Sequence, residues 1–245
     1  MPEPRIHLPV PLTVGQTVEL DDNARRHVVQ VLRLRAGDRI VLFNGEGGEY
    51  PATIVEAGKR SVQARIDAFT DIERESPLNV HLGLGISKGE RMDFALQKAT
   101  ELGVTQITPL FTERVVVKLD DRRLAKRLEH WHGVIVSACE QSGRNRLPRL
   151  HPAARLDDWL AARDEACRLF LDPRAGQALA DRARPAGAVA LAIGPEGGFS
   201  APERTGLRER HFAGVRLGPR VLRTETAALT ALAAVQLLWG DLGSG

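Results

Sequence analysis

Residues 189–200, Val-Ala-Leu-Ala-Ile-Gly-Pro-Glu-Gly-Gly-Phe-Ser, are the stretch that decides the fold. The apolar run from Val189 to Ile193 predicts a buried strand, and Ser200 with Pro202 and Glu203 predicts a capped helix. The Gly-Pro-Glu-Gly-Gly turn between them allows a ligand to approach the backbone closely. It stands at the carboxyl end of a strand, where open α/β sheets bind their ligands. An ordinary turn is the alternative interpretation.

A second stretch of this kind, residues 217–227, is Leu-Gly-Pro-Arg-Val-Leu-Arg-Thr-Glu-Thr-Ala. We expect a short strand at 215–217 before it and a helix that begins within it. Thr224 is the predicted N-cap, and Glu225 suits the positive end of the helix dipole. Two such loops could clasp one flat ligand between main-chain groups. Residues 83–89 also form a glycine-rich turn, but they fail the dinucleotide-binding spacing because Lys88 stands where a glycine is required.

The rest of the chain divides into two patterns. After Pro77, predicted strands (78–86, 104–111, 167–171, 188–193, 215–217) alternate with predicted helices (88–102, 120–142, 157–165, 201–210, 224–239). This alternation predicts an α/β fold whose parallel sheet is covered on both faces. Before residue 73, short strands at 39–43, 49–56 and 61–66 predict a meander or small barrel, with one helix from Asp21 or Asp22 to about Leu32. The polar segment 71–77 is the predicted linker, which gives domains at 1–73 and 74–245.

Composition narrows the class of protein further. The chain has 245 residues, of which 43% are hydrophobic and 27% charged, so a disordered tail, a collagen and a coiled-coil rod are excluded. No apolar run approaches the roughly 18 residues that span a bilayer, and the first ten residues show no signal-peptide pattern. The two cysteines fit a reducing cytoplasm, and neither they nor the histidines have metal-ligand spacing. We therefore expect a cytoplasmic protein with no membrane contact and no metal.

Basic residues suggest the kind of partner. The net charge is +3, and arginine supplies 29 of the 34 basic residues. Arginine suits phosphate, and its clusters at 25–39 and 122–149 are typical of nucleic-acid contact, although a composition bias is the plainer explanation. Residues 1–73 carry nine basic and eleven acidic residues, so only one face of that domain could bind RNA.

The predicted last helix, 224–239, is apolar nearly all round. A helix of this kind is buried on every side. It could reach that state by packing on its own sheet and on a second subunit, which predicts a homodimer. The alternative is a helix that simply runs through the core of a monomer.

The two glycine-rich stretches together resemble the SPOUT methyltransferases, and most of all the RsmE family of 16S ribosomal RNA uridine-N3 methyltransferases. Further blocks follow in the family's order, namely His27–Arg33, Lys88 with Arg91–Asp93, Gln97–Lys98, Thr100–Gly103, Ile107 with Pro109, Thr112–Arg114, and Ala138 with Glu140–Ser142, Arg144 and Pro148. Gln30 departs from the pattern, since a basic residue is expected there. The resemblance covers the whole chain.

The resemblance implies a fold, a cofactor and partners. The fold would be an N-terminal PUA-like β-barrel followed by a SPOUT domain with a trefoil knot, an exception to the usual threading rules. S-adenosyl-L-methionine would lie in the knot, and the partners would be 16S rRNA of the small ribosomal subunit and a second copy of the chain. The implied cofactor-binding residues are Leu171, Ile193, Gly194, Pro195, Glu196, Gly197, Gly198, Leu217, Gly218, Val221 and Leu222.

The implied reaction needs a group that handles the proton on uridine N3. A guanidinium facing a carbonyl oxygen of the base would favour the anion, and Arg114 and Arg223 are the candidates. Glu196 and Glu225 are candidate bases, since a dry pocket raises the pKa of a carboxyl group. The plainer roles are a helix-cap carboxylate for Glu225 and an ion pair for Arg223. The expected RNA-binding residues are Arg25, Arg26, Arg33, Arg35, Lys88, Arg91 and Arg144.

Two alternatives stay open on the sequence alone. The first is a sister SPOUT enzyme that methylates another base or a ribose 2′-hydroxyl, for instance in tRNA. The second is a non-catalytic RNA-binding assembly factor that keeps the fold. Failure to bind S-adenosylmethionine would favour the second.

Overall fold

The computed structural model describes residues 3–115 and 120–243. The chain forms two compact units, the first from Met1–Glu75 with Val136–Leu147 and the second from Ser76–Ile135 with Pro148–Gly245. The division at residue 73 that the sequence suggests stays a prediction. The first unit also takes in Val136–Leu147, which lies far beyond that division.

Hydrogen bonds explain why Val136–Leu147 belongs to the first unit. The Glu140 carboxylate accepts from the His7 amide at 3.0 Å, and the Asn145 side chain donates to the Ile72 carbonyl at 2.6 Å. Arg144 pairs with Glu75 through two bonds, of which the Nε–Oε1 bond is 3.1 Å. These contacts join residues 69 to 133 positions apart, so no local pattern could show them.

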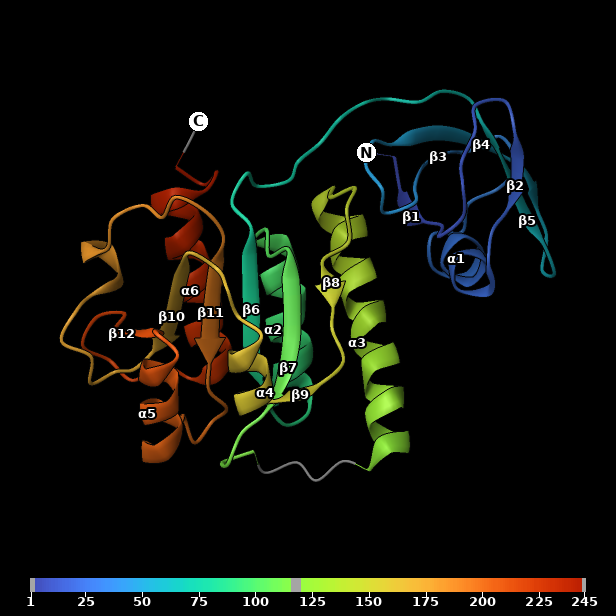
Figure 1. Cartoon of the computed structure of the whole chain (residues 1–245). Helices are drawn as coiled ribbons and strands as arrows, with labels where there is room; N and C mark the ends of the chain where they lie inside the picture. Colours follow the sequence, from blue (N-terminus) through green and yellow to red (C-terminus); the bar gives the residue numbers. More distant parts are fainter. Residues whose placement is uncertain (1–2, 116–119, 244–245) are drawn as a thin grey trace. The chain divides into compact units, whose positions relative to one another are not determined.

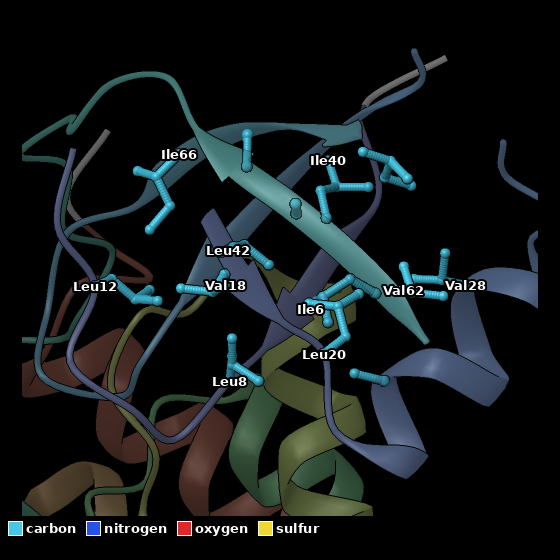
Figure 2. Close-up of a cluster of buried hydrophobic side chains, with 14 residues drawn as sticks. Ile6, Leu8, Leu12, Val18, Leu20, Val28, Ile40, Leu42, Val62 and Ile66 are labelled. Carbon is cyan, nitrogen blue, oxygen red and sulfur yellow. The ribbon is translucent and has the colours of Figure 1, made fainter. Parts of the chain in front are cut away.

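A five-stranded sheet forms the first unit. Its strands are β1 (Arg5–His7), β2 (Thr17–Glu19), β3 (Arg39–Phe43), β4 (Tyr50–Ala57) and β5 (Val62–Ile66), in the order β1-β3-β4-β5-β2. Only the β1–β3 pair is parallel among these pairings, and β4 carries a bulge between Ile54 and Glu56. Figure 2 shows the core, in which side chains from every strand meet, among them Ile6, Val18, Leu42 and Ile66.

The predicted helix of the first unit is present, but its second half is π-helical. Asp21 caps α1 (Asp22–Arg26) by accepting from the amides of Asn23 and Ala24, both at 2.9 Å. The chain then continues as a π-helical segment, His27–Val31. Val28 is fully buried against the sheet core (Figure 2).

The second unit is built on a seven-stranded sheet in which every assigned pairing is parallel. Its strands are β6 (Val80–Gly85), β7 (Gln106–Phe111), β8 (Arg149–Leu150), β9 (Ala154–Arg155), β10 (Cys167–Leu171), β11 (Val189–Ile193) and β12 (Ala213–Val215). The order is β12-β10-β11-β6-β7-β8, and β9 also pairs with β7. The predicted α/β class with a parallel sheet is confirmed.

Helices cover both faces of this sheet (Figure 1). They are α2 (Glu90–Glu101), α3 (Asp121–Ser142), α4 (Leu156–Ala161), α5 (Ala201–Glu209) and α6 (Thr224–Trp239), with a short 3-10 turn at Leu179–Asp181. α2 packs against α6, and α4 packs against α5. Trp159 of α4 lies directly over Gly83 of β6, where a Cβ atom would be 2.7 Å from the indole ring. Every residue of β6 and β11 is buried, as a sheet covered on both faces requires.

Two of the differences from the sequence-based expectations concern the last part of the chain. The strand expected at 215–217 is β12, Ala213–Val215, because Val215 is its last residue paired with β10 and its carbonyl then accepts from the Asp172 amide. α6 is not buried on every side, since Leu237 is 60% exposed and Leu238 41% exposed. None of the described helices is long and apolar enough to cross a membrane.

Candidate functional site: a cavity at three strand ends

Three neighbouring strands, β12, β10 and β11, run parallel and so end at the same edge of the sheet. The loops that follow them enclose a cavity of about 500 Å³. The lining residues are Leu171–Arg174, Ile193–Phe199, Val215–Leu222, Arg114, Arg204, Thr224 and Ala227. The loop after β10 and the loops that hold the two decisive sequence stretches are therefore brought to one place.

All eleven residues expected to bind a cofactor line this cavity, from Leu171 through Gly198 to Leu222. Arg114 joins them from the loop after β7. Arg223 and Glu225 do not line it. Asp172, Arg174 and Arg220 also line the cavity, within stretches that the family resemblance implies for the cofactor. Arg204 and Arg216 line it as well and were not expected; only their proximity to the strand ends could have indicated them. Five arginines and two carboxylates line the cavity, so its charge is positive.

The glycine-rich loop after β11 is a tight turn packed against its neighbours. The Gly198 amide donates to the Pro195 carbonyl at 2.7 Å, and Gly198 has a φ of +63°, which favours glycine. A Cβ on Gly85 would lie 2.4 Å from the Pro195 nitrogen, so two strand ends approach backbone to backbone. Ser200 and Glu203 then form the predicted capping box of α5.

Glu196 ties this loop to the start of α2. Its Oε1 accepts from the Lys88 amide and from the Arg91 guanidinium, both at 3.2 Å. Burial raises the pKa of Glu196, but hydrogen bonds from its own amide, Lys88 and Arg91 outweigh burial and lower the pKa overall. The raised pKa that was expected of Glu196 is therefore not found.

Arg114 contacts the glycine-rich loop after β11. Its Nη1 donates to the Gly197 carbonyl at 2.7 Å, and a Cβ on Gly197 would lie 3.0 Å from the Arg114 Cβ. The adjacent Glu113 amide donates to Oε1 of Glu203 at 2.7 Å. The turn at Glu113–Arg114 is thus fixed at two points to the chain that surrounds the cavity.

The loops after β10 and β12 are joined by backbone hydrogen bonds. The Asp172 amide donates to the Val215 carbonyl at 3.0 Å, and the Arg216 amide donates to the Gln177 carbonyl at 3.0 Å. The Arg216 guanidinium donates to the carbonyls of Ala175 and Gly176. These bonds join two walls of the cavity.

The two remaining candidates for catalysis, Arg223 and Glu225, lie at the start of α6. Thr224 is the first helical residue and not the cap; Arg223 occupies the cap position, and no side chain there caps the helix. Arg223 is exposed. Glu225 is half-buried, and its Oε2 is buried without a hydrogen-bond partner among the described residues. A carboxylate oxygen in that state calls for a partner that the described residues do not supply.

The residues expected to bind RNA have different surroundings. Arg26, Arg33 and Arg35 are exposed, whereas Arg25 is half-buried and pairs with Asp22 at 2.8 Å. Lys88 and Arg91 lie beside the cavity loop, where they contact Glu196. Arg144 is only 4% exposed because it is held by Glu75, so its expected place on an RNA-binding surface is wrong. No group of three or more metal-ligating side chains gathers in residues 3–115 and 120–243.

Comparison with known proteins defines the class. Residues 74–236 match the model of the RNA methyltransferase domain, and residues 20–67 match that of the RNA methyltransferase PUA domain. The chain is thus an RNA methyltransferase with an additional PUA domain.

Individual relatives define the family within this class. The ribosomal RNA small subunit methyltransferase E of Buchnera aphidicola from Schizaphis graminum is 34% identical, over 98% of both chains. The crystal structure of the corresponding enzyme of Neisseria gonorrhoeae bound to S-adenosyl methionine is 44% identical, with a TM-score of 0.92 over 98% of this chain and 99% of the other. A putative methyltransferase of Legionella pneumophila, in complex with the same cofactor, is 44% identical, with a TM-score of 0.96 over 99% of this chain and all of the other. The chain belongs to the ribosomal RNA small subunit methyltransferase E family.

Proposed function

We propose that this protein transfers a methyl group from S-adenosyl-L-methionine to N3 of a specific uridine in the 16S rRNA of the small ribosomal subunit. One observation carries the proposal: three strand-end loops, two of which hold the decisive motifs, enclose one cavity. Relatives that are 44% identical over nearly the whole chain are crystallised with this cofactor.

The cavity residues fit a ligand of this kind. A volume of about 500 Å³ lies within the roughly 300–1,000 Å³ of small-molecule sites. Gly198 and Gly218 have φ values of +63° and +71°, and a Cβ on either would meet nothing within 4 Å. Backbone without side chains therefore faces open space at both loops, which suits a ligand held by main-chain groups. The proposed cofactor-binding residues are the eleven named above, Leu171 to Leu222.

The cofactor supplies a methyl group on a sulfonium, which is a good leaving group, so we propose that no metal takes part. The chain's own work is alignment and electrostatics. We propose that Arg114 and Arg223 stabilise the uridine anion and that Glu225 accepts the N3 proton. Arg114 already lines the cavity, and Glu225 has a buried oxygen that finds no hydrogen-bond partner in the described part of the chain.

Two details of the fold belong to the proposal. The first is that β1–β5 close into a PUA-like barrel. The second is that the chain leaving β12 passes through the loop between β10 and β11 as a trefoil knot. The hydrogen bonds of Arg216 support the second, because its amide and carbonyl bond Gln177 and Leu179, both within that loop.

We also propose a homodimer that acts in the cytoplasm. Leu237 and Leu238 give α6 an exposed apolar strip that a second copy would cover. For the RNA, we propose contacts from Arg25, Arg26, Arg33, Arg35, Lys88 and Arg91. Phosphate contacts of this kind position the complex, while the shape of the cavity selects the base.

The test is methyl transfer to small subunits that lack the modification. Subunits are incubated with the protein and S-adenosylmethionine, and nuclease-digested RNA is analysed by mass spectrometry before and after. The proposal predicts one new 3-methyluridine per 16S rRNA. A methyl group on a ribose, or transfer only to tRNA, would assign the chain to a different reaction, and no transfer despite cofactor binding would contradict the enzymatic proposal.

A further inference from the structure

A second cavity, of about 420 Å³, lies at the same edge of the sheet as the first. It forms where β7 ends at Phe111, which pairs in register with Arg155 of β9. Residues that line it include Phe111, Thr112, Glu113, Arg155, Asp157 and Pro202. Nothing in the function proposed above uses this cavity.

Two polar groups in its lining have no hydrogen-bond or ion-pair partner among residues 3–115 and 120–243. The Thr112 hydroxyl is buried without a hydrogen bond among the described residues. The Arg155 side chain is exposed, and no hydrogen bond or ion pair of its guanidinium is present in the described part of the chain. Buried hydroxyl groups in native proteins are nearly always satisfied, so the Thr112 hydroxyl points to a ligand or an ordered water. An unpaired arginine beside it points to an anion.

The two cavities share a wall. Glu113 lines the second cavity, and the next residue, Arg114, lines the first. This turn is held at both sides, because the Glu113 amide donates to Glu203 and Arg114 donates to the Gly197 carbonyl. A polymer with one unit in the first cavity therefore has its neighbouring units close to the second.

We propose that the second cavity binds a nucleotide of the substrate RNA next to the target uridine; this inference rests on the proposed function. A base that enters an active site leaves the stack, and its neighbours lose a stacking partner. The Phe111 side chain offers such a neighbour an aromatic surface. The Arg155 guanidinium contacts its phosphate, and the Thr112 hydroxyl bonds a polar edge of the base.

The carboxylates at the cavity define the ligand further. Three carboxylates line the cavity. Glu203 already accepts from the amides of Glu113 and Ser200. Glu113 and Asp157 are exposed and accept hydrogen bonds only, so they suit a ribose hydroxyl or an amino group of a base. They also oppose a small free anion. A nucleotide within RNA satisfies the cation, the hydroxyl and the carboxylates together, whereas inorganic phosphate satisfies the cation alone.

Two variants test the proposal without disturbing the fold. Thr112→Val removes the hydroxyl that has no partner among the described residues, and Arg155→Gln removes an exposed charge that has no hydrogen bond or ion pair in that part of the chain. Arg184→Gln is the matched control, because Arg184 is also exposed and lies shortly before the start of β11, at the opposite edge of the sheet. For each, the cofactor Kd is measured by calorimetry, kcat and KM with unmodified small subunits, and RNA affinity at several salt concentrations.

We expect an unchanged cofactor Kd for all three variants. KM for the subunits rises about 5- to 10-fold in Thr112→Val and Arg155→Gln, with kcat within about twofold of wild type. Because Arg155→Gln loses one phosphate contact, the fall of log affinity with log salt becomes less steep, by about 0.7 in slope. In Arg184→Gln the slope is unchanged. A purely structural role of Arg155 would not change this slope.

The outcomes separate the two proposals. If wild-type protein methylates the subunits but Thr112→Val and Arg155→Gln keep wild-type KM and salt slope, the second cavity does not bind RNA and the proposed function stands. If wild-type protein transfers no methyl group, the proposed function fails, and the salt slope of RNA binding still decides whether the cavity contacts RNA.

Discussion

Gly198→Ala isolates the effect of backbone conformation on the cavity loop. Gly198 has a φ of +63°, and an added Cβ would meet nothing within 4 Å, so the methyl group causes no clash. A residue with a Cβ in this conformation costs about 1–2 kcal/mol. We therefore expect the unfolding free energy of the second unit to fall by about 1 kcal/mol. If the loop instead relaxes in the free protein, the unfolding free energy is kept and the same energy appears on binding, so that the affinity for S-adenosylmethionine falls about fivefold.

Gly206→Ala is the control for this experiment. Gly206 lies inside α5, its added Cβ would also meet nothing within 4 Å, and its φ is not positive. The same substitution in a helix interior stabilises a protein by about 0.5–1 kcal/mol, so the sign is opposite. Cofactor affinity should not change.

Urea unfolding and calorimetry check both variants. All three tryptophans, Trp131, Trp159 and Trp239, belong to the second unit, so their fluorescence reports its unfolding. The reasoning is refuted if Gly198→Ala is as stable as Gly206→Ala and both variants also bind the cofactor equally well.

Three further variants test other parts of the structure. Arg223→Ala should keep the wild-type unfolding midpoint, since Arg223 is exposed, and reduce kcat about 100-fold or more; near-normal kcat would remove Arg223 from the site. Glu75→Ala leaves the buried Arg144 guanidinium without its carboxylate and should destabilise the first unit by about 3 kcal/mol, measured by hydrogen exchange in β1–β5. Burial, followed by the charge of His81, lowers the pKa of His151 from 6.5 to about 4. Because the folded state then binds fewer protons, the second unit should lose stability as pH falls from about 6.5 towards 4. In His151→Gln, the unfolding free energy should depend less on pH in this range, as measured by urea unfolding at several pH values. An unchanged pH dependence would contradict this role of His151.

Helices and strands were predicted well where the residues that determine them lie close together in the sequence. The strand at Cys167–Leu171 and the helix at Thr224–Trp239 have the predicted bounds. The capping box at Ser200 also forms, because its two partners are three residues apart. The π-helical segment at His27–Val31 was not predicted, since no sequence signal separates it from a continuing α-helix.

The errors concern contacts between residues far apart in the chain. Arg144 is a charged residue in a basic segment, and the sequence does not show that Glu75 holds it in a buried pair. The pKa of Glu196 depends on Lys88 and Arg91, more than 100 residues earlier. The cavity itself was predicted because the carboxyl ends of parallel neighbouring strands must meet, and the two glycine-rich stretches marked two of them.

A crystal structure of the protein with S-adenosylmethionine tests the central claim most directly. We predict that the cofactor lies between the loops 171–174, 193–199 and 215–222, with main-chain groups of those loops in contact with it. Density for the cofactor at any other place, with this cavity empty, would contradict the assignment of the site.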